Sequence, residues 1–281
     1  FLGEFVWTAM DYIGEAGVGA TAYLKAGAPP FYFASYPWVN AWCGDIDLIG
    51  NQKGASRARD VAWGISPLEM SVQRPVPDGK FEYVAMWGWS DELQSWSWTG
   101  FEGKPLAVRL YSPGDRVELL LNGKKVGTKT LAASDKKRAE FKIPYTPGKL
   151  EAVAYRGGKV IGRRMLETVA APAKLRVTPE RAKGSRDRQA LHFVAIDILD
   201  AQGRIIPDDK RKLSLTIDGP ADLIGFGSAN PLAVGSLQSR DAESFHGRAM
   251  AVLRSQGKAG TVRVEARAEG LQGAATNVRL I

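Results

Sequence analysis

Four tryptophans lie close together in this sequence, at the alternate positions Trp87 and Trp89 and again at Trp96 and Trp98. Residues two apart on a β-strand point to the same face, so each pair presents its rings side by side. Exposed rings in this arrangement form the binding strip of carbohydrate-binding modules, because a flat aromatic face suits the apolar face of a pyranose. The alternative is that the rings are buried between a β-domain and the residues that precede it.

The other residue types that carry chemistry are sparse. His192 and His246 are isolated, and Cys43 is the single cysteine. No pair of His, Cys or carboxylate residues has the spacing of a metal site, and no glycine-rich phosphate loop is present. We therefore expect no metal, no cofactor and no disulfide within the chain.

The composition is that of an ordinary globular protein. With 281 residues and 44% hydrophobic content the chain can bury two or three cores. No apolar stretch approaches the roughly 20 residues of a membrane helix, so no membrane partner is expected. The net charge of +8 divides into −3 for residues 1–70, +6 for 71–170 and +5 for 171–281. Because the basic residues are spread over strands and turns, we interpret them as solvated faces and expect no nucleic-acid partner.

The first 67 residues differ in pattern from the rest. Residues 5–10 form a near-continuous apolar run, which predicts a buried strand of a parallel sheet. Residues 55–63 place apolar side chains three to four positions apart, which predicts a helix that Pro67 closes off. A loop-rich stretch joins them, so this part is interpreted as one βα unit.

From residue 68 onward the apolar period is two, and turn residues separate short strands at 106–111, 117–121, 150–155 and 160–161. Asn122-Gly123 is a strong hairpin signal, and residues 156–159 indicate a second hairpin. After the linker 170–173 come further alternating strands at 174–177, 192–198, 213–217, 249–253 and 261–266. We predict a mainly β fold with two immunoglobulin-like sandwiches.

These patterns divide the chain into domains at residues 1–67, 68–170 and 171–281. The first residue, Phe1, lies inside an apolar run and is not a Met, and no signal peptide is visible. We expect the chain to be a fragment of a longer protein. The missing N-terminal part of that protein is its expected partner.

Four motifs in this order resemble the C-terminal third of glycoside hydrolase family 2. They are residues 3–15, 42–50, 117–127 and the pair 225–231 with 243–249. The resemblance implies the end of a (β/α)8 barrel followed by two β-sandwiches, with the tail of the bacterial β-galactosidase subgroup. The family's tryptophan-rich stretch often begins His-Trp-Asn-Trp, whereas Met86-Trp87-Gly88-Trp89 stands here. Its similarity to that junction favours burial of the four rings against residues 1–67.

Retaining glycosidases need two carboxyl groups about 5–5.5 Å apart. The resemblance implies that both glutamates of this pair lie upstream of Phe1. Glu4 and Glu15 are the available substitutes. Glu4 falls at the stability face of a barrel strand and Glu15 has no partner, so the isolated chain is predicted to be inactive.

The same resemblance assigns a sugar-binding role to Trp7, as the floor of a subsite, with Asp11 and Trp42 in loops on the same face. It also implies a cis peptide bond between Trp7 and Thr8. The alternative roles are purely structural: Trp7 fills the barrel core, and Asp11 and Trp42 cap turns or pack in the loops.

The leading hypothesis is therefore the C-terminal fragment of a retaining β-glycosidase, with terminal β-galactosides as the expected substrates. Glucuronides and mannosides stay open, because the residues that contact the distinguishing hydroxyls lie mostly upstream. The rival hypothesis is a stand-alone carbohydrate-binding or adhesion module. The resemblance further implies a periplasmic or secreted bacterial location.

Overall fold

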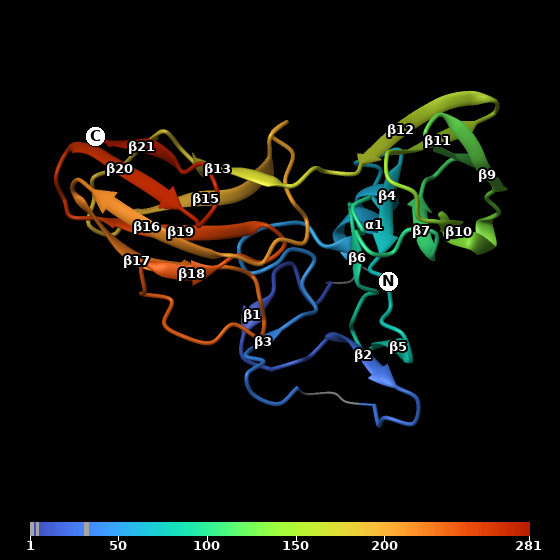
Figure 1. Cartoon of the computed structure of the whole chain (residues 1–281), viewed down its shortest axis with the longest axis horizontal. Coiled ribbons are helices and arrows are strands. Elements are labelled where there is room, and N and C mark those ends of the chain that lie inside the picture. Colours follow the sequence, from blue (N-terminus) through green and yellow to red (C-terminus); the bar gives the residue numbers. More distant parts are fainter. Residues whose placement is uncertain (1–2, 4–5, 31–33) are drawn as a thin grey trace. The chain divides into compact units, whose positions relative to one another are not determined.

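The computed structural model describes residues 3, 6–30 and 34–281. It is mainly β, as predicted. The chain divides into two compact units, residues 1–168 and residues 169–281 (Figure 1). Within the described residues no helix has the length and apolar character required to cross a bilayer.

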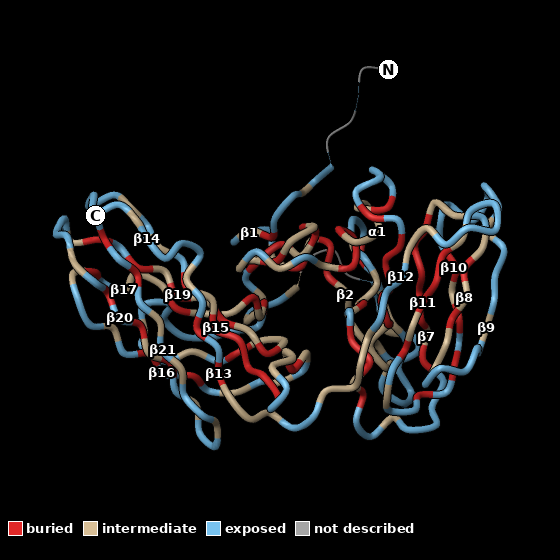
Figure 2. Tube along the Cα trace, turned by 90° about the horizontal axis from the view of Figure 1, so that it is seen from above, coloured by how far each residue is buried: buried red, intermediate tan, exposed pale blue. Residues whose placement is uncertain are grey.

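The first unit contains a sandwich of two antiparallel sheets. One sheet has the order β10-β7-β4-β6 and the other β12-β11-β8-β9. Side chains from both sheets meet in one core that includes Met70, Val108, Leu119 and Leu150. In Figure 2 the tube along β7, β8 and β11 is mostly buried or intermediate. Along β8 the buried residues Val117 and Leu119 alternate with neighbours of intermediate burial, as the period of two requires. The strands of the first sheet are β10 (Arg138–Pro144), β7 (Pro105–Tyr111), β4 (Glu69–Gln73) and β6 (Glu92–Leu93), and those of the second are β12 (Lys159–Glu167), β11 (Lys149–Arg156), β8 (Arg116–Leu121) and β9 (Lys124–Thr130).

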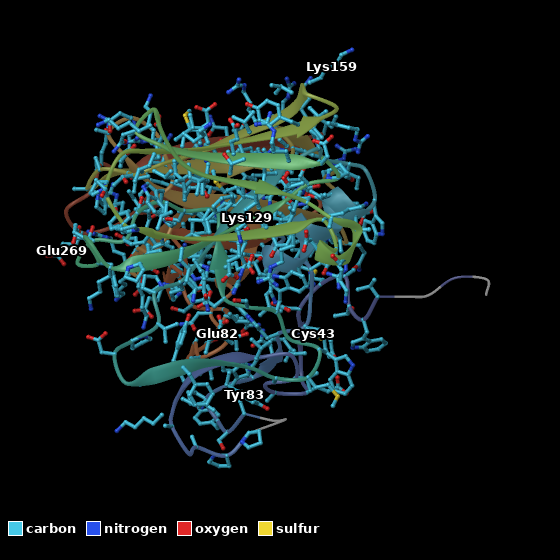
Figure 3. The ribbon with its side chains drawn as sticks, turned by 90° about the vertical axis from the view of Figure 1, so that its right-hand side faces the viewer. Cys43, Glu82, Tyr83, Lys129, Lys159 and Glu269 are labelled. Carbon is cyan, nitrogen blue, oxygen red and sulfur yellow. The ribbon has the colours of Figure 1, made fainter. Side chains whose placement is uncertain are left out.

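Both predicted hairpins are confirmed. Asn122 and Gly123 join β8 to β9 with φ angles of 50° and 77°. Gly157 and Gly158 join β11 to β12 with φ angles of 55° and 79°. Lys159, just after the second turn, points into solvent in Figure 3. A short 3-10 helix, η1 (Ala133–Asp135), precedes β10.

The second unit is also a sandwich. Its sheets have the orders β13-β15-β19-β17 and β14-β21-β20-β16-β18. The core between them includes Ile196, Leu213, Phe226, Leu253 and Val264. All five predicted strands of this region are confirmed, although β14, β17, β18 and β21 were not predicted. The first sheet contains β13 (Pro172–Pro179), β15 (Leu191–Asp200), β19 (Arg248–Ser255) and β17 (Ala221–Gly227), and the second contains β14 (Lys183–Gly184), β21 (Ala274–Leu280), β20 (Gly260–Arg267), β16 (Lys212–Asp218) and β18 (Asp241–Glu243).

The N-terminal part of the first unit is built mostly from loops. β1 (Tyr12–Ile13) pairs with β3 (Asn40–Ala41), and the predicted helix forms as α1 (Gly54–Ala62). β2 (Thr21–Lys25) pairs with β5 (Lys80–Val84), so a strand of residues 1–67 is joined to a strand of residues 68–170. Figure 3 shows Glu82 and Tyr83 of β5 on the side of the unit where Cys43 also lies. The three-domain division stays a prediction.

The predicted buried strand at residues 5–10 is not formed. Phe5 lies outside the described residues, while Val6, Trp7 and Met10 are exposed. Residues 8–11 hydrogen-bond with residues 43–46, and Met10 forms a single parallel bridge with Ile46. A strand of a parallel sheet is buried only when neighbours and covering helices enclose both its edges and faces, and one neighbouring segment does not do so. The apolar run therefore wrongly predicted both a strand and its burial, although residues 8–11 do hydrogen-bond with a neighbouring segment.

Candidate functional site

Backbone hydrogen bonds hold residues 8–11 beside residues 43–46. The Asp45 N–H donates to the Thr8 carbonyl at 3.0 Å, and the Asp11 N–H donates to the Ile46 carbonyl at 2.9 Å. Gly44 makes this approach possible, because a Cβ at that position would lie 2.2 Å from the Asp11 nitrogen. The two loops that carry Trp7, Asp11 and Trp42 are therefore adjacent.

Trp7 presents its ring to solvent. The side chain is 68% exposed, and the Trp7–Thr8 peptide bond is cis, as the resemblance implied. The indole Nε1–H donates to the Tyr12 hydroxyl at 3.3 Å, and the two rings meet edge to face at 6.4 Å between centroids. The Tyr12 hydroxyl in turn donates to the Glu15 carboxylate. Trp7 is thus an exposed ring whose edge is held by Tyr12.

Asp11 lies at the opposite extreme of exposure, because it is buried against Lys53. The Lys53 ammonium donates to Oδ1 and Oδ2 of Asp11 at 2.9 and 3.0 Å. The Gly44 N–H also donates to Asp11 Oδ1, at 2.8 Å. Burial raises the pKa of Asp11 to about 6 although the Lys53 charge opposes this rise. Burial likewise lowers the pKa of Lys53 against the opposing effect of Asp11.

Trp42 is tied to the same lysine. Lys53 Nζ donates to the Trp42 carbonyl at 2.7 Å and lies 4.2 Å from the centroid of the Trp42 ring. The Trp38 ring meets the Trp42 ring nearly edge to face, with 6.0 Å between centroids. The Trp42 N–H donates to the Val18 carbonyl at 2.7 Å. The structure therefore brings Asp11 and Trp42 together through Lys53 and places both beside the loop that carries Trp7.

Comparisons with known proteins cover the whole chain. Residues 175–277 match the family "Glycoside hydrolase family 2 C-terminal domain 5", and residues 103–162 match a domain of unknown function, DUF4982. A solved structure of a glycosyl hydrolase family 2 member from Bacteroides cellulosilyticus is 30% identical. It superposes on the chain with a TM-score of 0.90, covering 100% of this chain and 36% of its own length. The chain belongs to glycoside hydrolase family 2 and corresponds to a C-terminal portion of its members.

Curated relatives of the family 2 chain carry more than one activity in their names. A β-galactosidase of Bacteroides ovatus is 26% identical over 278 residues, which is 98% of this chain and 28% of the relative. A protein of Formosa agariphila, provisionally named a β-glucuronidase, is 27% identical over 255 residues, which is 90% of this chain and 22% of the relative. The chain thus spans about a quarter of the relatives that it matches.

The two glutamates considered as substitutes for the catalytic pair have different outcomes. Glu4 lies outside the described residues. Glu15 is exposed on a turn with φ of 44° and accepts the Tyr12 hydrogen bond. Within the described part of the family 2 chain, no group of three or more His, Cys, Asp or Glu side chains could hold a metal ion.

The four clustered tryptophans do not form an exposed strip. Trp96 and Trp98 are buried in the core of the first sandwich, where Trp96 Nε1–H donates to the Thr146 carbonyl at 2.9 Å. Trp89 lies against the start of α1, within 3.1 Å of where a Cβ on Gly54 would be. Trp87 is 60% exposed. Trp89 contacts α1 but is 38% exposed, so the predicted burial of the four rings against residues 1–67 is wrong. Trp96 and Trp98 are buried in the core of the sandwich instead.

Sequence reasoning missed Lys53, Trp38 and Tyr12 as members of the site. Lys53 lies 42 residues from Asp11 and Tyr12 is one of several tyrosines, so neither is marked by local spacing. The clue that was available is that Lys53 lies three residues after the segment 42–50, which resembles the family, and immediately precedes α1.

Proposed function

We propose that the parent of this chain is a retaining β-glycosidase that hydrolyses terminal β-galactosides, and that the chain supports the barrel and lines part of the sugar site. The observation that carries the proposal is the similarity to the Bacteroides ovatus β-galactosidase over 98% of the chain. Since the chain spans 28% of that relative, the catalytic glutamates are assigned to the upstream part of the parent.

Trp7 is proposed as the sugar platform. Its ring is exposed and its edge is fixed by Tyr12, so the indole face can cover the apolar face of a pyranose without reordering the loop. Asp11 and Trp42 complete the proposed site. Because Asp11 is 2% exposed, we assign it to holding the loop in place, and we assign Trp42 to the wall beside the platform.

The cation beside Trp42 is already paired with a carboxylate. A glucuronide carries a carboxylate that a binding site recognises best with an unpaired cation. Lys53 is the basic side chain at Trp42, and the Asp11 carboxylate already neutralises it. Lys53 is therefore not available to recognise the carboxylate of a glucuronide.

The full-length parent should be assayed with aryl β-galactoside and aryl β-glucuronide under the same conditions. The proposal expects kcat/KM for the galactoside to exceed that for the glucuronide at least tenfold, which corresponds to about 1.4 kcal/mol of transition-state discrimination. A preference of the same size for the glucuronide would contradict it.

The isolated chain is expected to hydrolyse neither substrate, since it lacks the required pair of carboxylates. Activity above a buffer blank that disappears in Glu15→Gln would make Glu15 a catalyst and refute this part of the proposal.

We also propose a periplasmic or secreted location for the parent, which is supported by the family resemblance alone. Fractionation of the source bacterium with an antibody against this chain would detect the parent outside the cytoplasm. Recovery in the cytoplasmic fraction only would contradict the proposal.

A further inference from the structure

Lys53 occupies a central position between the two loops of the proposed site. Its side chain is 17% exposed, whereas the Asp11 side chain is fully buried. A lysine ammonium has three N–H donors. Three oxygens receive them, namely Oδ1 and Oδ2 of Asp11 and the Trp42 carbonyl, all within 3.0 Å.

The side-chain contacts of Lys53 join two parts of the chain that backbone hydrogen bonds also hold side by side. Asp11 precedes β1, and Trp42 follows β3, and each of these strands has two residues. The Lys53 N–H donates to the Asp45 carbonyl at 2.8 Å, so the backbone of Lys53 is anchored next to the same loop. One lysine therefore contacts the Asp11 carboxylate, the Trp42 carbonyl and the Trp42 ring at once.

We propose that Lys53 is a positioning residue of the sugar site, which holds the Trp42 wall and the Asp11 loop in register through one ammonium group. The proposal rests on the proposed function of Trp7 and Trp42. Lys53 does not contact the sugar, because its three donors are occupied. Its effect on catalysis passes through the placement of Trp42.

Loss of either charge leaves the other partly buried and uncompensated, which is more disruptive than loss of both. Lys53→Met removes the ammonium and keeps most of the apolar stem. Asp11→Asn removes the negative charge and keeps an oxygen that accepts from the Gly44 N–H. The KM and the unfolding equilibrium constant of the double variant Asp11→Asn/Lys53→Met should therefore differ less from the parental values than the product of the two single effects predicts.

Lys104 provides a matched control. Its ammonium pairs with Asp78 at 3.4 Å and lies 5.3 Å from the Phe101 ring centroid, so it also combines a carboxylate and an aromatic ring. Both members of this pair are exposed, and exposed pairs contribute little. Lys104→Met therefore removes the same two kinds of contact, an ion pair and a cation–ring contact, outside the proposed site.

The experiment uses the full-length parent with an aryl β-galactoside. Lys53→Met is expected to raise KM about tenfold while kcat changes less than threefold, because a displaced wall weakens binding of substrate and transition state alike. Lys104→Met should leave both constants within twofold of the parent. Near-UV circular dichroism should show an altered tryptophan band in Lys53→Met and the parental band in Lys104→Met.

Two results would overturn the positioning role: a Lys53→Met enzyme with parental KM and tryptophan band, or equal effects from Lys53→Met and Lys104→Met. Strictly additive single and double variants would also refute it. A parent that hydrolyses no aryl glycoside would refute the proposed function instead. In that case the tryptophan band and the coupling between Asp11 and Lys53, measured as the change in the unfolding equilibrium constant, still decide whether Lys53 holds the two loops.

Discussion

The loops of residues 6–53 and the sandwich of residues 169–281 are organised by different interactions. In the sandwich, strands of seven to ten residues such as β15 and β19 are joined by continuous ladders over a shared apolar core. In the loops, strands of two residues are supplemented by isolated backbone hydrogen bonds and by side-chain contacts, among them those of Lys53 with Asp11 and Trp42. Substitutions in the sandwich should therefore act on stability, and substitutions in the loops should act on the site.

The largest stability effect is expected in the core of the second unit. Phe226 is 1% exposed, and Phe226→Ala should lower the free energy of unfolding by about 3–5 kcal/mol through lost burial and the cavity left behind. Urea unfolding of the chain measures this. Phe193→Ala, at a position on the same unit that is 36% exposed, should cost far less, and equal effects would contradict the assignment of the core.

A smaller, pH-dependent effect is expected at Asp200. Burial alone would raise the pKa of Asp200, but hydrogen bonds from the N–H and guanidinium of Arg204 and from the Ala170 N–H hold it at about 2. A carboxyl whose pKa is depressed in the folded state stabilises the fold at pH values above its ordinary pKa of 3.8. This contribution is lost as the pH falls toward 2. Asp200→Asn should cost about 2 kcal/mol at pH 7, as expected for hydrogen bonds to a charged group.

The difference in the free energy of unfolding between Asp200→Asn and the unmodified chain should become smaller from pH 4 to pH 2. Urea unfolding across that range measures it. Asp218→Asn, at an exposed position of the same unit, serves as the control for the loss of a carboxylate and should cost much less than Asp200→Asn at pH 7. A cost at Asp200 that is independent of pH would mean that the charge is not what stabilises the turn.

The pattern of residues predicted the sandwiches better than the loops because the two kinds of order leave different traces in a sequence. Alternation in residues 213–217 and the Asn122-Gly123 turn are local signals, and both proved correct. The pairing of β2 with β5 joins residues 21–25 to residues 80–84, and no local pattern marks it. Lys53 and Asp11 meet across 42 positions for the same reason. Trp7 could be predicted only through the family resemblance, since its apolar neighbours suggested burial.

The smallest of the stability effects is expected at the first hairpin turn. Gly123 has φ of 77°, and a Cβ there would meet no atom within 4 Å, so Gly123→Ala tests backbone conformation alone. The expected cost is about 1 kcal/mol, because L-residues disfavour the left-handed region. Gly225→Ala is the matched control, because its φ lies outside the left-handed region and a Cβ there would make only van der Waals contact with Val252 at 3.7 Å. Thermal unfolding that shows equal losses for both would refute the assigned turn.

The central claim concerns Trp7, and kinetics of the full-length parent on an aryl β-galactoside test it most directly. Trp63 is the control, since it is 64% exposed against 68% for Trp7 and lies at the end of α1. The account predicts that Trp7→Ala lowers kcat/KM at least tenfold, or about 1.4 kcal/mol, while Trp63→Ala changes it less than twofold. Equal kcat/KM values for the two variants would contradict a sugar platform at Trp7.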